Sequence, residues 1–381
     1  MLKKNLPFEN HLSHDLGGNL MPCYSPLIRI ENKKKTVKAK DGHRYHPATI
    51  QTASEILGER LEDVDKRGSE IKQIIGSDYD YQIIPCGNCI GCRLDYSREW
   101  ANRGYLEAKC WDQNWFVTLT YDEDHITVLE ETQDDQGITY WNEGDWNGTL
   151  VPKDLTQFMK NLRQIMKREH YQDNIRFMAC GEYGSEGERP HYHIILFNCN
   201  LPMESFYEPR IINHEVYYQN KIIERAWGNK GISNISEASW NNIAYTARYI
   251  TKKINGNLSE SLYAEKGQTK EFFRVSRMPG IGEIYYREHK DDIYRNDEII
   301  IKNKQGTISS KPPKYFDKLY EKEEPEKFKK IKERRKKQLK TNNILQDQTH
   351  TYGRLEELYI QARTKEESTM KLIREFEKKG S

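Results

Sequence analysis

The sequence has no long hydrophobic run. Of its 381 residues, 36% are hydrophobic and 31% are charged, and the mean hydropathy is −0.93. No stretch approaches the roughly 18 consecutive apolar residues that a membrane-spanning helix needs. The N-terminal residues MLKKNLPFENHLSHDL also lack the apolar segment of a secretory signal peptide. We therefore expect a polar, soluble protein that neither crosses a membrane nor carries a secretory signal.

The sequence also lacks a strong excess of either charge. Its 60 lysines and arginines nearly balance 58 aspartates and glutamates, which leaves a net charge of +2. The basic residues are concentrated near the C-terminus, in the run KFKKIKERRKKQLK from Lys327 to Lys340. Such a run is usually a solvated helix, and binding of phosphate groups is the more specific alternative. The candidate DNA-binding residues of this run are Lys327, Lys329, Lys330, Arg334 and Arg335.

Cysteines are few and do not form an even set. Three of the seven lie in the segment PCGNCIGCR, as Cys86, Cys89 and Cys92. In a chain without a secretory signal, this spacing favours reduced thiols or a bound metal over disulfides. A structural Zn²⁺ site needs a fourth ligand, which Cys23 or Cys110 could supply. The alternative is a tight turn that contains reduced cysteines.

The segment GEYGSEGERPHYHIILF, from Gly181 to Phe197, predicts a β-hairpin with the preceding apolar strand. His191 and His193 are two residues apart, so they lie on one face of the second strand. Glu182 lies just before the turn and is placed to add a carboxylate. Two histidines and a carboxylate leave open coordination positions on a catalytic metal ion. The alternative is that one histidine is an ordinary surface or core residue, as we expect for Tyr192 on the opposite face.

A second candidate group lies in the helix predicted over SWNNIAYTARYITKKI, residues 239–254. Tyr245 and Tyr249 are four residues apart and share one helix face. A tyrosine hydroxyl has a pKa near 10, so it needs a cation or base nearby to act as a nucleophile. Such a pair, taken alone, is more often a pair of packing residues. Three basic residues lie within about one turn of the tyrosines: Arg248, Lys252 and Lys253.

The order of elements predicts an α+β fold. A strand over Trp115–Asp122 is followed by an amphipathic helix with apolar residues from Leu155 to Met166, and then by the hairpin. Short strands interrupted by helices favour an antiparallel sheet with helices on one face, in a ferredoxin-like or RRM-like layout. Thr118 is interpreted as an ordinary strand residue. Four regions are expected: an N-terminal region with the cysteine cluster (1–110), the core (111–256), an irregular extension (257–310) and a charged, helical, basic C-terminal region (311–381).

Three motifs in this order resemble those of the HUH-type rolling-circle replication initiation proteins of microviruses, the gokushovirus-like single-stranded DNA phages. They are FVTLTYD (Phe116–Asp122), RPHYH (Arg189–His193) and YTARYITKK (Tyr245–Lys253). The segments PCGNCIGCR, GEYG and MPGIG are also similar to that group, and the resemblance spans about residues 21 to 290. Tyr192 stands where the histidine motif of the family usually has a large aliphatic residue.

The resemblance implies an HUH endonuclease that nicks single-stranded DNA at the viral origin. A tyrosine, Tyr245 or Tyr249, would attack the phosphorus to give a 5′-phosphotyrosine and a free 3′-OH, with assistance from Lys252 or Lys253. Glu182, His191 and His193 would hold Mg²⁺ or Mn²⁺. Single-stranded origin DNA and host replication proteins would be the partners, in the cytoplasm of a bacterial host. The alternatives are a non-catalytic single-stranded nucleic-acid-binding protein and a metal-dependent hydrolase that activates water.

Overall fold

The computed structural model describes residues 23, 27–38, 44–52, 76–126, 132–133, 139–140, 148–169, 174–184, 188–212, 215–252, 268–303 and 306–347. These residues belong to two compact units. The larger unit contains the described residues of Tyr96–Tyr320. The second contains those of Asn19–Asp95 and of Glu321–Lys379. No helix in the described part of the chain is long and apolar enough to cross a membrane.

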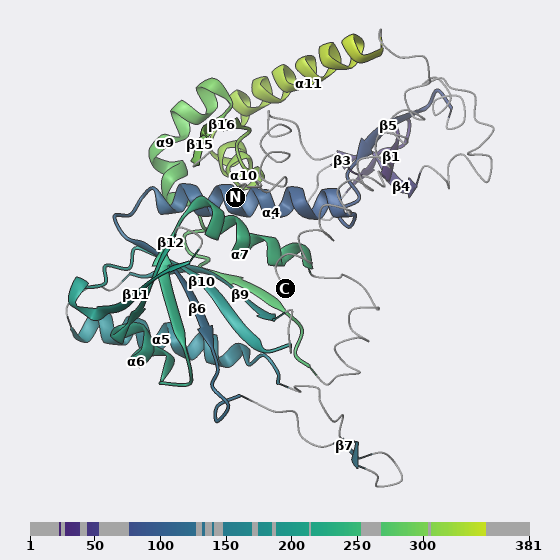
Figure 1. The fold of residues 1–381 in the computed structure, drawn as a ribbon. Coiled ribbons are helices and arrows are strands. Elements are labelled where there is room, and N and C mark those ends of the chain that lie inside the picture. Colours follow the sequence, from purple (N-terminus) through teal and green to yellow (C-terminus); the bar gives the residue numbers. More distant parts are fainter. Residues whose placement is uncertain are drawn as a thin grey trace, which may run out of the picture. The chain divides into compact units, whose positions relative to one another are not determined.

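The larger unit is built on a seven-stranded sheet with the strand order β11-β12-β13-β6-β10-β9-β14, in which every neighbouring pair is antiparallel (Figure 1). The predicted histidine hairpin is present, as β9 and β10, and β10 lies between β9 and β6. The α+β class and the antiparallel sheet are therefore confirmed. The strands are β6 (Asn114–Thr120), β9 (Arg176–Tyr183), β10 (Pro190–Phe197), β11 (Phe206–Ile212), β12 (Glu215–Asn220), β13 (Ser233–Glu237) and β14 (Phe272–Val275).

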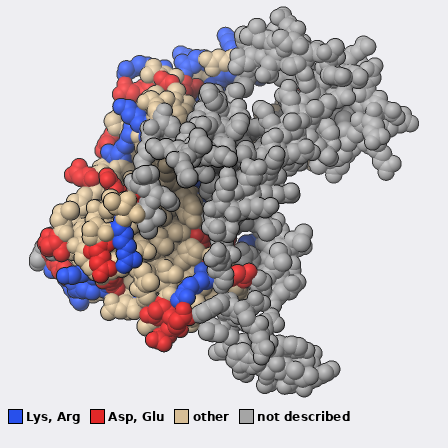
Figure 2. Space-filling model, viewed as in Figure 1, with Lys and Arg blue, Asp and Glu red and all other residues tan. Residues whose placement is uncertain are grey.

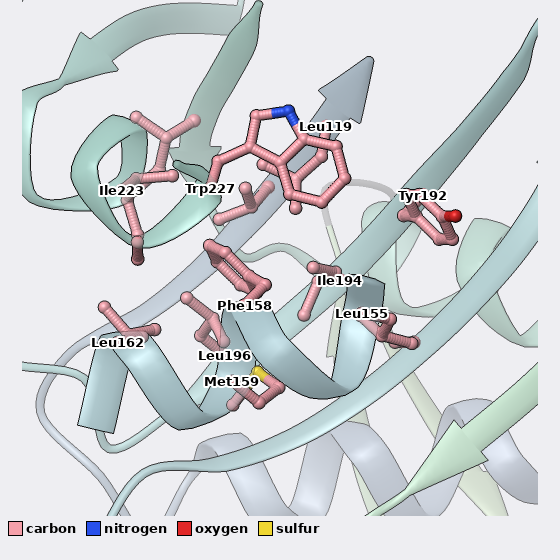
Figure 3. Close-up of a cluster of buried hydrophobic side chains, with 14 of the residues drawn as sticks. Leu119, Leu155, Phe158, Met159, Leu162, Tyr192, Ile194, Leu196, Ile223 and Trp227 are labelled. Carbon is pink, nitrogen blue, oxygen red and sulfur yellow. The ribbon is translucent and has the colours of Figure 1, made fainter. Parts of the chain in front are cut away.

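One face of this sheet is covered by α5 (Pro152–Arg168) and α6 (Lys221–Trp227), as Figures 1 and 3 show. The apolar residues of α5 recur three and four positions apart, so they form a single buried face. In Figure 3 they lie against side chains of β6, β10 and α6. The labelled members of this cluster are Leu119, Leu155, Phe158, Met159, Leu162, Tyr192, Ile194, Leu196, Ile223 and Trp227.

The other face is covered by α7 (Trp240–Lys252) and by the part of α4 (Ile90–Ala108) that belongs to the larger unit. Ile243 and Ala247 of α7 pack in one cluster with Ile195 and Phe197 of β10. The prediction that helices cover only one face was therefore wrong. The run Ile194–Phe197 is buried at every position, and a strand that is apolar on both sides needs cover on both sides.

Residues 257–310 are not the irregular extension that we expected, because the described part contains regular elements. Strand β14 adds the last strand to the sheet, with Phe272 packed on one face and Phe273 on the other. Burial on both faces explains why this segment has no period-two pattern in the sequence. It is followed by α9 (Glu283–Asn296) and by a pair of strands, β15 (Ile299–Asn303) and β16 (Gly306–Ser310).

The predicted C-terminal helical region contains α10 (Lys314–Glu323) and α11 (Pro325–Asp347), and residues 348–381 lie outside the described residues. Phe316 of α10 is fully buried and lies against Tyr286, with ring centroids 5.4 Å apart. The second unit contains a three-stranded antiparallel sheet with the order β4-β1-β5. Its strands are β1 (Leu27–Asn32), β4 (Ala48–Thr52) and β5 (Tyr79–Ile84). The short elements are β2 (Val37–Lys38), β3 (Arg44–Tyr45), β7 (Thr132–Gln133), β8 (Thr139–Tyr140) and a 3₁₀ turn at Met203–Ser205.

Gly104 allows α4 to approach α7 and β9 closely. A Cβ at this position would lie 2.7 Å from Ile243 Cγ2 and 2.8 Å from Met178 Sδ. Ile243 is β-branched and buried, so its Cγ2 cannot swing aside freely. We expect Gly104→Ala to lower the free energy of unfolding by about 1–2 kcal/mol. Overpacking costs about 1–3 kcal/mol, whereas the higher helix propensity of alanine returns at most about 1 kcal/mol.

Urea denaturation measures this change. The matched control is Lys160→Ala on the exposed side of α5, where only helix propensity changes. Equal or increased stability of Gly104→Ala would contradict the close approach.

Candidate active site

The pairing of β9 with β10 brings three predicted metal ligands together. Glu182 lies directly opposite His191 in the antiparallel register, and His193 lies opposite Cys180. The Nε2 atoms of His191 and His193 lie 2.7 Å and 2.8 Å from the same oxygen, Oε1 of Glu182. The ligand atoms of the three residues all lie within 4.8 Å of one another. The two histidines therefore share one face, as their spacing predicted.

This cluster suits a divalent cation. The Glu182 side chain is only 2% exposed, and its Oε2 is buried without a hydrogen-bond partner in the described part of the chain. A buried polar atom without a partner is costly, and a bound ion would satisfy it. Two imidazoles and a carboxylate form a mixed nitrogen and oxygen donor set, which suits Mn²⁺ and Mg²⁺ better than a thiolate set would.

Each imidazole is held through its Nδ1 atom. Nδ1–H of His191 donates to the carbonyl oxygen of Arg189 at 3.0 Å, and Nδ1 of His193 lies 3.0 Å from the hydroxyl of Thr118 on β6. Because a carbonyl oxygen only accepts, Nδ1 of His191 carries the proton, and Nε2 is its ligand atom. Thr118 was missed by the sequence analysis. Its role follows from the pairing of His193 with Thr118 across β10 and β6, and only the register reveals that pairing.

The charge state of the cluster follows from its burial and its contacts. Burial alone would lower the pKa of His191, but hydrogen bonding to Glu182 and the charge of Glu182 outweigh it and raise this pKa above its ordinary value. Burial would likewise raise the pKa of Glu182, but the hydrogen bonds from His191 and His193 lower it. Without a metal, the site is therefore an ionised carboxylate between imidazoles that protonate readily.

The candidate nucleophile Tyr245 lies beside this cluster. It is half-buried on α7, and its ring lies edge-on to that of His193, with centroids 5.1 Å apart and an interplanar angle of 84°. Phe116 of β6 completes the contact, because it stacks on His193 at 5.4 Å and meets Tyr245 edge-on at 6.5 Å. Residues more than fifty positions apart thus meet in one site.

The other predicted residues of α7 are placed less fully. Arg248 is half-buried on the same helix as Tyr245. Tyr249 and Lys252 belong to α7, but their side chains are not described, and Lys253 lies outside the described residues.

Tyr192, between the two histidines, points to the opposite face, as predicted. Its side chain is fully buried in the cluster of Figure 3. Its hydroxyl accepts a hydrogen bond from the backbone N–H of Val151 at 2.9 Å and lies 2.8 Å from the hydroxyl of Tyr121. Tyr121 in turn donates to Asp154 at 2.6 Å. The histidine strand is therefore also held from behind by a buried polar network.

The remaining candidates lie in the second unit. Cys86, Cys89 and Cys92 cluster with Cys23, whereas the thiol of Cys110 donates to the carbonyl oxygen of Leu106. The basic candidates all belong to α11: Lys327, Lys329, Lys330 and Arg334 are exposed, and Arg335 is half-buried. Figure 2 shows that acidic and basic side chains are intermixed on the described surface in view.

The fold and site together define a class of protein: an antiparallel sheet whose central strand carries a His-x-His cluster, next to a helix that carries tyrosine. The model of a family described as replication-associated protein ORF2 matches residues 114–254, a range that includes every element of this site. The chain belongs to this family of phage replication-associated proteins. The resemblance to rolling-circle replication initiators of microviruses is thereby confirmed.

Three relatives come from phages of different bacteria. The replication-associated protein ORF2 of Spiroplasma virus 4 is 38% identical over 259 residues, which cover 67% of this chain and 73% of the relative. VP4 of Bdellovibrio phage phiMH2K is 28% identical over 250 residues, covering 64% and 70%. ORF4 of Chlamydia phage 1 is 30% identical over 174 residues, covering 45% and 38%. No solved structure matches the chain.

Metal binding at Glu182 is expected to stabilise the protein. At a Mn²⁺ concentration about 100 times the Kd, a bound ion raises the free energy of unfolding by about 2.7 kcal/mol. Glu182→Gln should remove most of the Mn²⁺-induced rise in Tm, because a neutral amide is a much weaker ligand. Glu237→Gln, at an exposed position on β13, is the matched control and should respond to Mn²⁺ like the parent.

The same measurement has a defined pH dependence. The raised pKa of His191 stabilises the metal-free fold below the unfolded value of about 6.5, and this stabilisation is lost as pH rises through the folded pKa. Mn²⁺ needs neutral histidines, so its effect on Tm should shrink as pH falls through that same folded pKa. Thermal unfolding with Mn²⁺ and with EDTA between about pH 5 and 8 tests this. A Mn²⁺ effect that is independent of pH would contradict histidine ligation.

Proposed function

We propose that this protein is an HUH-type endonuclease that nicks single-stranded DNA at the viral replication origin and later rejoins the ends. The observation that carries the proposal is the edge-on contact between Tyr245 of α7 and His193 of β10. It joins a nucleophile to a group of metal ligands that comes from a different part of the chain. Rolling-circle replication initiation by this family is the biological setting.

The proposed reaction is a transesterification. The tyrosine Oη forms a bond to the scissile phosphorus while the bond from phosphorus to the 3′ oxygen breaks. The tyrosine loses its proton, and the leaving 3′ oxygen takes one up to become the 3′-OH that primes synthesis. Because the phosphotyrosine keeps a phosphodiester, a 3′-OH can attack it in the reverse sense and join two ends without another energy source.

Glu182, His191 and His193 would hold Mg²⁺ or Mn²⁺, and the ion would supply charge neutralisation at a phosphate oxygen. The chain itself contributes orientation. The Arg189 carbonyl and the Thr118 hydroxyl fix the two imidazoles, and Phe116 covers one face of His193. Fixed ligands require no rearrangement when the substrate binds.

Two tyrosines on one helix suit alternating cleavage and joining. One would hold the DNA end while the other attacks the newly made origin. Lys252 is proposed to assist Tyr249, with Lys253 as the alternative, because a nearby cation favours the phenolate form. Arg248, on the same helix, would contact a phosphate of the DNA.

The basic side chains of α11 are proposed to add non-specific affinity for the phosphate backbone. Lys329, Lys330 and Arg334 are exposed on one helix, where each can replace a counterion of single-stranded DNA. Since the relatives are phage proteins, the protein would work in the cytoplasm of a bacterial host, together with host replication proteins.

Cleavage should depend on the tyrosines. Labelled single-stranded origin DNA incubated with the protein and Mn²⁺ should give a covalent protein–DNA band on a denaturing gel. The double variant Tyr245→Phe/Tyr249→Phe should lower its yield by roughly 10³-fold or more, because no nucleophile remains. Tyr217→Phe, on β12 and next to Glu215, is the matched control and should cleave normally.

The alternatives give different results in this assay. A nicked product without a protein adduct, retained in the double variant, would identify a hydrolase that activates water. DNA binding without any cleavage would identify a non-catalytic binding protein. Either outcome overturns the tyrosine mechanism.

The contribution of α11 is measured by salt dependence. The triple variant Lys329→Gln/Lys330→Gln/Arg334→Gln should bind single-stranded DNA more weakly. Its plot of log Kobs against log salt should be shallower by about 0.7 for each phosphate contact that is lost. Lys153→Gln/Lys160→Gln/Lys167→Gln is the matched control, since these exposed lysines lie on α5, which covers the other face of the sheet from Tyr245. Equal slopes for the α11 variant and the parent would leave α11 as a solvated helix.

A further inference from the structure

Four of the seven cysteines meet in the second unit, although one is more than sixty residues from the others. Cys23 precedes β1, and Cys86 follows β5. Cys89 directly precedes α4, and Cys92 lies in its first turn. The other three cysteines lie elsewhere: Cys110 at the end of α4, and Cys180 and Cys199 buried in the larger unit. The cluster therefore gathers the thiols of three chain segments at one point.

The distances between the sulfur atoms match those around a single tetrahedral ion. Sγ of Cys86 lies 4.0 Å from Sγ of Cys92, and Sγ of Cys89 lies 3.8 Å from Sγ of Cys23. All four Sγ atoms lie within 4.8 Å of one another. A Zn²⁺ ion with Zn–S bonds of about 2.3 Å at tetrahedral angles places its sulfur ligands about 3.8 Å apart.

Two other arrangements of four cysteines fit these distances less well. A disulfide needs an S–S distance of about 2.05 Å, well below either of the two measured pairs. In an iron–sulfur cube, each cysteine binds a different iron atom, so the cysteine sulfurs lie farther apart than around one ion.

The backbone is also arranged to support thiolates. The N–H groups of Cys86, Cys89 and Cys92 donate to the sulfurs of Cys23, Cys86 and Cys89 at 3.2, 3.3 and 3.5 Å. Such hydrogen bonds favour the deprotonated form, which is the form that binds metal. Gly87 makes the turn possible, because its φ of 78° lies in the left-handed region that favours glycine.

We propose that Cys23, Cys86, Cys89 and Cys92 bind one structural Zn²⁺ ion. Four thiolates complete a tetrahedral shell and leave no position for water or substrate, so the ion has no catalytic role. The site differs in ligand chemistry from the group of Glu182, His191 and His193, and it does not depend on the proposed nuclease function.

The small sheet of the second unit gives this ion a purpose. Among the residues of β1, β4 and β5 whose side chains are described, only Ile28 and Ile30 are buried. Three short strands with so small an apolar core need an additional cross-link to be stable. The zinc would tie the segment before β1 and the end of β5 to the first turn of α4.

Metal analysis of the full-length chain tests the proposal. The protein, purified without strong chelators and dialysed, should contain about one zinc per chain by mass spectrometry of the metal. Cys23→Ser and Cys92→Ser should each lose the bound zinc, whereas the control Cys110→Ser should keep it. The double variant His191→Ala/His193→Ala should also keep its zinc, which separates this site from the nuclease site. Replacement by Co²⁺ should give the intense visible absorption of tetrahedral cobalt thiolate.

Titration of the parent with a mercurial reagent provides a test that does not require the variants to fold. Zinc should be released in step with the reaction of four thiols. Iron in place of zinc, disulfides between these cysteines in the unreduced protein, or zinc retained in a soluble Cys23→Ser variant would each overturn the proposal.

Discussion

The register of three antiparallel strands is the constraint on which the site depends. Because β10 pairs with β9 on one side and with β6 on the other, a single alignment places Glu182 opposite His191 and Thr118 opposite His193. A slip of one residue would turn both histidines to the other face of the sheet and bring Tyr192 into their place. The alternation of side chains on β10 thus separates the metal ligands from the core residue between them.

The two halves of the site are supported differently. The metal ligands belong to central strands, where hydrogen bonds on both sides hold the backbone. The tyrosine belongs to α7, which is positioned by packing alone, through Ile243 and Ala247 against the sheet and through the close approach of α4 at Gly104. A buried ion pair between Glu107 of α4 and Arg176 of β9 also joins α4 to the sheet, with a distance of 2.6 Å. Precise ligand geometry and an adjustable nucleophile are thus obtained from different kinds of structure.

The sequence predicted the parts of the fold and site that depend on local periodicity. The two-residue spacing of His191 and His193, the amphipathic pattern of α5 and the position of α7 are all local, and they were correct. The participation of Thr118 and Cys23 depends on strand register and on long-range contacts, which local spacing does not contain. The roles of Tyr249 and Lys252 stay predictions.

Other features were hidden because the local pattern was disturbed. Strands β11 and β12 were missed: Pro209 interrupts β11, Glu208 has a φ of 46°, and the pairing is irregular between Tyr207 and Arg210. Helices on both faces were missed because a run of consecutive apolar residues does not say which side will be covered. In both cases, neighbouring elements determine the structure more than intrinsic preference does.

Tyr192 has a consequence for how this sequence can change. An aliphatic residue at this position, as in the usual family motif, would fill the core but would leave the backbone N–H of Val151 without its acceptor and remove a partner of the Tyr121 hydroxyl. A single step back to the aliphatic form is therefore unfavourable, although each state is compatible with the fold when its surroundings match. Positions 192 and 121 are expected to be mutually dependent, and the acceptable residue at one depends on which residue is already present at the other.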